Sequence, residues 1–202
     1  SAMPIAQALR LCPQAMAVPV PRQACGTTSR AIGAVLARFT PVVAGASIDE
    51  WYLDLSGTEA LYGHETLEAT AVRIRETVQR ETGMWLSIGG GTSKLIAKLA
   101  AERAKPRPEI GGTGVRIIPD GGEAEFLSGL TLAEIPGVGP KLQARLATFG
   151  LVRVADVLPH ERATLARWLG RRTAEWLWAR ARGIHTTAVE ARAAARQMSR
   201  ET

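Results

Sequence analysis

Cysteine is scarce in this chain, and the cysteines present form no redox or zinc motif. Cys12 and Cys25 lie far apart and give no CxxC pair. The three histidines, His64, His160 and His185, show no metal-ligand spacing, so we interpret them as surface or capping residues. A disulfide between the two cysteines is one alternative. Two reduced thiols are the simpler interpretation and are typical of a cytoplasmic protein, which is the location that we expect.

Long hydrophobic runs are also missing. No stretch approaches the roughly 20 apolar residues that cross a bilayer, and the opening S-A-M-P-I-A-Q-A-L-R lacks the charged and then apolar pattern of a signal peptide. We therefore expect no membrane association. With 46% hydrophobic and 22% charged residues over 202 positions, the composition is that of a globular protein with one large domain or two small ones.

Acidic residues are few in the last third of the chain. From Val138 to the end, twelve Lys and Arg stand against five Asp and Glu, a net charge of +7, and eleven of the twelve are Arg. The residues before Val138 carry thirteen bases and fourteen acids, a net charge of −1. This excess predicts either an Arg-rich helical surface in water or a face that binds a polyanion, and charge alone does not separate the two.

The first half of the chain mixes strand patterns with helix patterns. Short apolar runs predict strands at 15–20, 41–47, 51–55, 84–88 and 115–118. Apolar residues at helical spacing predict helices over 22–39 and 65–81, and a third helix over about 93–103 ends before two prolines. After Asp120 the strand patterns stop and short helical stretches follow, so we place a domain boundary near residues 119–122.

The stretch L-T-L-A-E-I-P-G-V-G-P-K-L-Q-A-R-L-A-T-F-G, 130–150, has the pattern of a helix–hairpin–helix. Proline suits the first turn of the second helix, and the two glycines leave room for backbone N–H groups to approach a phosphate. A plain turn between two helices is the alternative, but the pattern favours binding of a nucleic-acid backbone without reading of the bases. The residues that we expect to contact DNA here are Gly137, Val138, Gly139, Lys141 and Arg145.

The stretch G-G-G-T-S-K, 89–94, resembles a phosphate-binding P-loop only superficially. In that motif a glycine directly precedes the lysine, and here Ser93 intervenes. Lys94, Lys98 and Lys105 follow at spacings of four and seven, which places them on one side of a helix. They could approach a phosphate, and a solvated basic stripe is an equally good interpretation.

The stretch S-I-D-E-W-Y-L-D-L, 47–55, places Asp49 and Glu50 side by side between two predicted strands. In a regular strand their side chains would point to opposite faces, so they can serve one site only at a strand end or hairpin corner. Two adjacent carboxylates need a positive partner, and Mg²⁺ held by carboxylates and substrate phosphates is the partner that we expect. The alternative is an acidic hairpin tip in water.

Taken in order, these stretches resemble the Y-family, or translesion, DNA polymerases. The resemblance covers essentially the whole chain and rests on S-A-M-P-I-A-Q-A-L-R-L-C-P, S-I-D-E-W-Y-L-D, L-S-I-G-G-G-T-S-K-L-I-A-K-L-A-A-E-R-A-K-P and I-P-G-V-G-P-K. It implies an α+β fold, in which a mixed palm domain is followed by a small all-α thumb. The implied division is the end of a fingers domain at 1–21, the palm at 22–119, the thumb at 120–186, and a linker at 187–202.

The resemblance also implies roles for individual residues. Asp49 and Glu50 would be two of three carboxylates that hold two Mg²⁺ ions for nucleotidyl transfer, and Ser47 and Tyr52 would line that site. Lys105 would contact the triphosphate, whereas Lys94 and Lys98 are weaker candidates, near DNA or structural. The implied partners are primer–template DNA, deoxynucleoside triphosphates and, through further C-terminal parts, a sliding clamp. We expect a monomer.

Several family features have no counterpart in this chain. These are the Asp-x-Asp strand with the first catalytic aspartate, the steric-gate aromatic residue, the fingers' Tyr and Arg, and the last domain, the little finger. We therefore expect a fragment that is inactive by itself. Trp51 stands where the family usually has a small residue, and R-P-E-I-G-G-T-G replaces a shorter turn after A-K-P. A non-catalytic helix–hairpin–helix module that binds DNA is the alternative function.

Overall fold

The computed structural model describes residues 3–63, 65–107, 112–185 and 188–190. Its elements are α1 (Ile5–Leu11), α2 (Arg22–Leu36), β1 (Val42–Gly45), β2 (Trp51–Asp54), the 3-10 helix η1 (Glu59–Tyr62), α3 (Leu67–Thr82), β3 (Ile88–Gly90), α4 (Lys94–Ala104), β4 (Val115–Ile117), α5 (Glu123–Ser128), the 3-10 helix η2 (Leu132–Glu134), α6 (Pro140–Ala147), α7 (Val154–Val157), α8 (Arg162–Leu169) and α9 (Arg171–Ala181). None of the described helices is long and apolar enough to cross a membrane.

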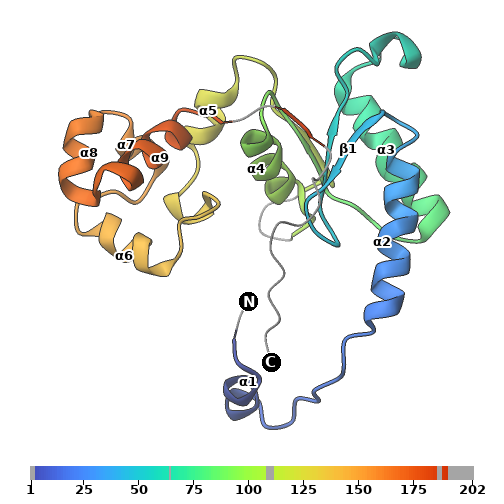
Figure 1. The fold of residues 1–202 in the computed structure, drawn as a ribbon, viewed down its shortest axis with the longest axis horizontal. Coiled ribbons are helices and arrows are strands. Elements are labelled where there is room, and N and C mark those ends of the chain that lie inside the picture. Colours follow the sequence, from blue (N-terminus) through green and yellow to red (C-terminus); the bar gives the residue numbers. More distant parts are fainter. Residues whose placement is uncertain (1–2, 64, 108–111, 186–187, 191–202) are drawn as a thin grey trace.

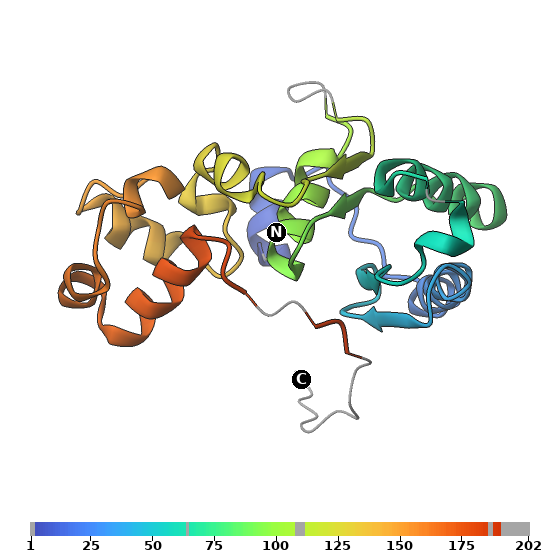
Figure 2. The same cartoon turned by 90° about the horizontal axis from the view of Figure 1, so that it is seen from above.

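The elements form a mixed part and a helical part. Helices α6 to α9 make a lobe at one end of the molecule, α2 and α3 lie at the other end, and α4 lies between them (Figures 1 and 2). The helical part carries only an isolated β-bridge, between Thr131 and Arg153, within the residues that the structure describes. This arrangement confirms the α+β fold class predicted from the sequence.

A first hydrophobic core joins α2 and α3 to the β1–β2 hairpin. The apolar stripe of α2 and the following turn is buried, as its helical spacing predicts, and it packs on two residues of α3. The buried residues are Ile32, Val35, Leu36, Phe39, Ile74 and Val78. Trp51 and Leu53 of β2 pack against this core from the strand side, so the same packing that folds the hairpin also fixes the position of its corner.

A second, larger core crosses the boundary predicted near residues 119–122. Helix α4 contributes Leu95, Ile96 and Leu99 to it, and Ile118 follows from the end of β4. These residues pack in one cluster with residues of the helical lobe, among them Leu127, Leu132, Ile135, Leu146, Val154, Leu165 and Leu177. Since the burial is continuous, α4 is tied to the lobe by its core, and the division into domains at residue 120 remains an expectation.

Two small sheets lie within the mixed part. Strands β1 and β2 pair antiparallel, with Val43 opposite Leu53, whereas β3 and β4 pair parallel, with Gly89 opposite Arg116. A side chain at Gly89 would collide with the backbone of α4 at Ala97 and Ala101. Only glycine therefore lets this helix pack directly on the strand.

Two strand predictions were wrong. Residues 15–20 form no strand; they are exposed, lie between prolines 13 and 21, and follow α1, which buries none of its residues. The strand predicted at 84–88 instead begins at Ile88 and continues into the glycines at 89 and 90. Glycine is a poor strand former in isolation, but here the close packing of α4 requires it.

Parts of three sequence predictions fall outside the described residues. The turn R-P-E-I-G-G-T-G includes 108–111, the expected linker includes 187 and 191–202, and His64 is not described either. Both cysteines are free thiols, which agrees with the reduced interpretation.

Candidate functional site

The hairpin between β1 and β2 turns at the two adjacent carboxylates. The ladder runs from Val42 opposite Asp54 to Gly45 opposite Trp51, and beyond it the amides of Ala46 and Ser47 both donate to the carbonyl oxygen of Glu50, at 2.8 and 3.2 Å. The regular alternation of side chains therefore ends at this corner. The sequence prediction that Asp49 and Glu50 lie at a hairpin corner is confirmed.

Asp49 has only local partners in the described part of the chain. The Ser47 hydroxyl donates to Asp49 Oδ1 at 2.5 Å, and the Asp49 amide donates back to Ser47 Oγ at 3.4 Å. The residue is exposed. Ser47 therefore orients one carboxylate oxygen and leaves the other open to a further ligand.

Glu50 is held by two donors from different elements. Lys98 Nζ of α4 lies 2.6 Å from both carboxylate oxygens, and the Tyr52 hydroxyl donates to Oε1 at 2.8 Å. Burial alone would raise the pKa of Glu50, but the hydrogen bonds from Lys98 and Tyr52 outweigh it, and the pKa is lowered. The carboxylate is therefore ionised at neutral pH.

Tyr52 links this ion pair to a second lysine. Burial, together with its hydrogen bond to the charged Glu50, raises the pKa of the phenol, so the hydroxyl stays protonated and donates. Lys94 Nζ lies 5.6 Å from the centre of the Tyr52 ring, within cation–π range. Two of the three predicted lysines thus converge on the corner from α4.

A cavity of about 810 Å³ opens beside the corner, between the two small sheets. Asp49 and Glu50 line it together with Lys98 and Lys105, and β3 contributes the run Ile88 to Gly90. Lys105 caps the C-terminus of α4 and pairs with Glu102. The cavity therefore brings these two lysines together with five acids, since Asp54, Glu65 and Glu102 line it as well. The carboxylates suit a cation, and the lysines suit an anionic ligand that accompanies the cation.

Trp51 lines this cavity and also belongs to the packing around α2. A Cβ added to Gly33 of α2 would lie 3.5 Å from Trp51 Nε1, an ordinary contact distance, so the ring lies against α2. The ring packs against the first hydrophobic core.

The predicted helix–hairpin–helix forms as expected between η2 and α6. Pro140 occupies the first turn of α6, and Gly137 has a φ of 99°, a value that favours glycine. A Cβ at Gly137 would lie 2.8 Å from Trp176 Cζ2, so α9 packs directly on the turn. Val138 is buried and its amide donates to the carbonyl of Ile135 at 3.0 Å, which anchors the turn from inside.

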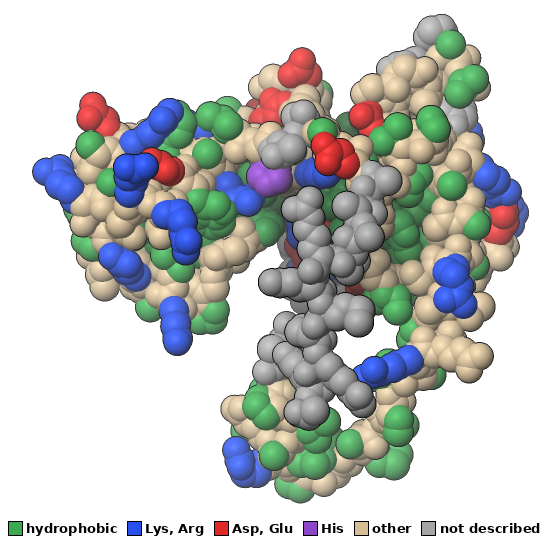
Figure 3. Space-filling model, in the orientation of Figure 1, with side chains coloured by type: hydrophobic (Ala, Val, Ile, Leu, Met, Phe, Trp, Pro, Cys, Tyr) green, Lys and Arg blue, Asp and Glu red, His purple; other side chains and the backbone are tan. Residues whose placement is uncertain are grey.

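The two predicted basic residues of α6 differ in their surroundings. Lys141 is exposed and follows the hairpin by one position. Arg145 donates from Nη2 to the carbonyl oxygen of Trp168 at 2.6 Å, so it also ties α6 to α8. Lys and Arg side chains lie across the surface of the lobe formed by α6 to α9 (Figure 3).

The sequence did not predict that α9 packs on the turn of the helix–hairpin–helix. Trp176 packs on Gly137, and the Arg180 guanidinium lies 4.9 Å from the centre of the Trp176 ring. Burial lowers the pKa of Arg180. The i, i+4 spacing of the two residues was visible in the sequence, but nothing local connects α9 to residues 136–141.

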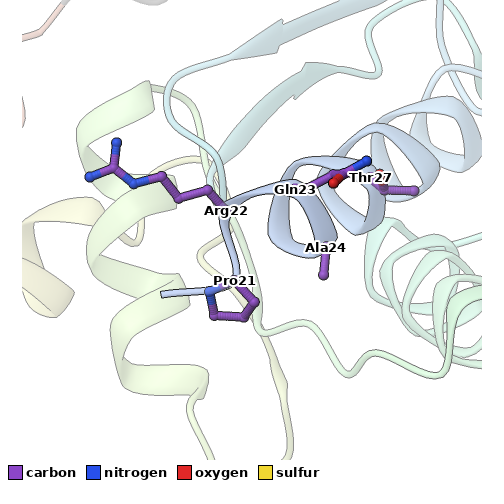
Figure 4. Close-up of a pocket in the computed structure, with 5 residues that line it drawn as sticks. All are labelled: Pro21, Arg22, Gln23, Ala24 and Thr27. Atoms are coloured by element: carbon purple, nitrogen blue, oxygen red, sulfur yellow. The ribbon is translucent and has the colours of Figure 1, made fainter. Parts of the chain in front are cut away.

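A second, shallower pocket lies at the start of α2. Pro21, Arg22, Gln23, Ala24 and Thr27 line it, and the Arg22 side chain extends away from the other four (Figure 4). None of the site residues predicted from the sequence reaches this pocket, and it contains no acid. It is not a candidate for metal or triphosphate binding.

The corner carboxylates fit a magnesium site that a bound ligand completes. Mg²⁺ is usually bound by one or two carboxylates plus substrate phosphates and water. Asp49 and Glu50 supply two carboxylates beside the Ser47 hydroxyl. Among the described residues, no group of three or more His, Cys, Asp or Glu side chains could hold a metal ion by itself. The two carboxylates therefore supply only part of the ligands of a Mg²⁺ site, and substrate phosphates and water would supply the rest.

Comparison with known proteins gives the family. The profile of the impB/mucB/samB family matches residues 1–102, and the profile described as DNA polymerase-iota, thumb domain, matches residues 133–185. DNA polymerase IV of Yersinia enterocolitica is 36% identical over 91% of this chain and 50% of its own length. DNA polymerase IV of Desulfatibacillum aliphaticivorans is 32% identical over 100% of this chain and 48% of its own length. The chain spans about half the length of these curated relatives.

Solved structures show the same likeness. A DinB family error-prone DNA polymerase from Sulfolobus solfataricus has a TM-score of 0.77 and 27% identity, over 94% of this chain and 55% of that one. An insertion ternary complex of Dbh DNA polymerase has a TM-score of 0.77 and 26% identity, over 94% of this chain and 53% of that one. A chimera described as a Y-family DNA polymerase has a TM-score of 0.75 and 27% identity, over 95% of this chain and 54% of that one. The resemblance found in the sequence is thereby confirmed: the chain belongs to the impB/mucB/samB family, that of the Y-family DNA polymerases.

Proposed function

We propose that the whole protein is a DNA-directed DNA polymerase that extends a primer across damaged template, with deoxynucleoside triphosphates as substrates. The family, the names of its relatives and the geometry of the hairpin corner support this proposal. Its remaining parts, carried over from the sequence, are a monomeric state, a cytoplasmic location and recruitment by a sliding clamp.

One observation carries the proposal. Asp49 and Glu50 share a hairpin corner beside a cavity that Lys98 and Lys105 also line. An acidic turn in water needs neither the cavity nor the bases. A triphosphate accompanied by a divalent cation uses both, because the cation needs carboxylates and the phosphates need lysines.

The proposed roles follow from these contacts. When bound, two Mg²⁺ ions would activate the primer hydroxyl and neutralise the triphosphate. Asp49 and Glu50 would hold the ions from the corner, Ser47 would orient Asp49, and Tyr52 would orient Glu50. Lys105, which also lines the cavity, would contact the triphosphate.

The proposed grip on DNA lies in the lobe of α6 to α9. Gly137 and Gly139 would let the turn approach a phosphodiester, with Lys141 and Arg145 adding positive charge and Val138 anchoring the turn. Lys94 and Lys98 would approach the nucleic acid or the triphosphate only after leaving their partners at the corner.

We propose further that the 202-residue polypeptide alone extends primers poorly or not at all. Its two corner carboxylates lack a third, because the described residues gather no larger group of metal ligands. In the described part of the chain, the β1–β2 and β3–β4 sheets are also not paired with each other. Robust extension by this polypeptide with Mg²⁺ and four nucleotides would contradict this proposal.

The test of the main proposal is Asp49→Ala in the whole protein. We expect primer extension to fall about a thousandfold or more, since the metal loses a ligand, and duplex affinity by fluorescence anisotropy to stay within about twofold. Asp120→Ala is the matched control, because Asp120 is an exposed acid outside the corner.

The second candidate function is a non-catalytic DNA-binding module. The well-formed hairpin with its buried anchor favours it, because that part of the structure needs no metal. Under this alternative, Asp49→Ala changes neither synthesis nor binding. The same pair of measurements therefore separates the two functions.

A further inference from the structure

The ion pair between Lys98 and Glu50 occupies the atoms that a metal ion would need. Lys98 Nζ lies 2.6 Å from both Glu50 oxygens, so the ammonium group contacts both oxygens of the carboxylate at once. The two side chains are 42% and 34% exposed, so the pair faces the cavity and is not sealed in the core. A divalent cation would compete for the same lone pairs and would meet the positive charge of the ammonium.

The groups around Glu50 leave Lys98 as its direct positive partner among the described residues, so the loss of this lysine would change the charge at the corner. Asp49, the second carboxylate, has no ion-pair partner among the described residues, and it raises the cost of a second negative charge at Glu50. Lys94 lies over the Tyr52 ring and Lys105 is paired with Glu102, so neither of them contacts Glu50. Lys98 alone therefore supplies the direct counter-charge at the corner in the described structure.

We propose that Lys98 is a positioning residue that holds Glu50 in the metal-free protein and exchanges it for a phosphate when a metal–phosphate complex binds. This rests on the proposed function, in which the corner holds a divalent cation. A free cation that binds Glu50 must displace Lys98 and leaves the ammonium group without a new anionic partner. A cation that arrives with phosphate provides a new anion for the lysine, so the exchange favours the complex over the free ion.

Exposed ion pairs often contribute little to stability, and a purely structural pair is the competing explanation. The two explanations differ in what removing the ammonium does to metal affinity. A structural lysine, once removed, leaves the affinity unchanged or lowers it. An exchanging lysine, once removed, raises the affinity for the free ion and lowers the gain that phosphate brings.

The test is Mn²⁺ binding by electron paramagnetic resonance, with and without inorganic pyrophosphate, on the 202-residue chain. Lys98→Met keeps most of the aliphatic stem and removes the charge. We expect it to bind free Mn²⁺ about tenfold more tightly than the unmodified chain, and to gain less from pyrophosphate. Arg103→Met is the matched control on the same helix and should change Mn²⁺ affinity by less than about twofold, because Arg103 pairs with Glu134 and does not contact Glu50.

A thermal melt in the absence of metal provides a second measurement. Lys98→Met should lower the melting temperature by about 2 °C, and this difference should disappear in a Glu50→Gln background. If Lys98→Met does not fold, Lys98→Gln replaces it in both measurements. A loss of the same size in both backgrounds would contradict the proposal.

Glu50→Gln separates the outcomes. If it abolishes Mn²⁺ binding while Lys98→Met binds like the unmodified chain, the role of Lys98 is overturned and the metal site stands. If Glu50→Gln binds Mn²⁺ as well as the unmodified chain, the proposed function itself fails at this corner. If no variant binds Mn²⁺, both proposals fail for this chain.

Discussion

Asp49 and Glu50 are neighbours in sequence, but their side chains have different partners. Asp49 accepts a hydrogen bond from Ser47, two residues earlier in the same turn. Glu50 accepts from Tyr52 and from Lys98, which belongs to a helix 48 residues further along the chain. One acid is thus oriented locally and the other by the tertiary fold. We expect the geometry of Glu50 to be lost first when α4 is disturbed.

The turn of the helix–hairpin–helix, at residues 136–139, leads to a prediction about a single residue. Gly137→Ala should lower the free energy of unfolding by about 2 kcal/mol, because the residue has a φ of 99° and its Cβ would lie 2.8 Å from Trp176. Urea denaturation measures the change. An effect below about 0.5 kcal/mol would show that the turn relaxes freely.

Gly139→Ala is the matched comparison in the same turn. Gly139 has a φ of −81°, and no atom lies within 4 Å of the Cβ position, so we expect stability to change by less than about 0.5 kcal/mol. Duplex affinity should nevertheless fall severalfold, because the added methyl group would stand where a phosphate approaches the backbone. Unchanged affinity in an anisotropy titration would contradict the proposed grip.

At the scale of elements, short helices in the lobe depend on side chains at their ends. The Asp156 carboxylate accepts hydrogen bonds from the amides of Val152 and Arg153, at 2.9 and 2.6 Å, and so fixes the start of α7. The backbone hydrogen bond from Arg153 is the main cause of its lowered pKa. A four-residue helix has few bonds of its own, so this contact matters for its placement.

We therefore predict that Asp156→Ala lowers the free energy of unfolding by about 1 kcal/mol at neutral pH. A lowered pKa stabilises the fold above the ordinary pKa of the group, 3.8, and the stabilisation is lost as pH falls through the folded value. As pH falls from about 4 through the lowered pKa of Asp156 in the folded protein, the variant and the unmodified chain should thus converge. A difference that stays constant down to pH 2 would contradict this linkage.

Some of the elements could be predicted from the sequence and others could not. The helices α2, α3 and α4, the hairpin corner and the turn at 136–139 follow from local spacing, proline and glycine, which act over a few residues. The strand Ile88–Gly90 could not be placed, because its glycines are selected by the close approach of α4. The contacts of Lys98 with Glu50 and of Trp176 with Gly137 were also beyond reach, since they join residues distant in sequence.

At the scale of the whole molecule, the excess positive charge belongs to the part of the chain that forms the helical lobe. Figure 3 shows its Lys and Arg side chains spread over the surface, with few acids between them on the visible face. The core that joins α4 to the lobe ties this surface to the helix that carries Lys94 and Lys98. The proposed catalytic corner and the proposed DNA grip are thereby connected through α4.

Duplex binding by the chain should consequently weaken steeply with salt. Each phosphate contact contributes about −0.9 to the slope of log affinity against log salt, so Lys141→Ala should make the slope shallower by about 1. Arg38→Ala is the control, because Arg38 pairs with Glu81 at the opposite end of the molecule. Equal slopes for all three proteins would remove Lys141 from the interface.

The most direct test of the central claim is anomalous diffraction from the whole protein crystallised with Mn²⁺, primer–template DNA and a deoxynucleoside triphosphate. The account predicts a Mn²⁺ peak within coordination distance of a carboxylate oxygen of both Asp49 and Glu50, with Lys98 moved from Glu50 to a phosphate. A fully occupied triphosphate whose Mn²⁺ lies away from the corner, with Lys98 still on Glu50, would contradict it.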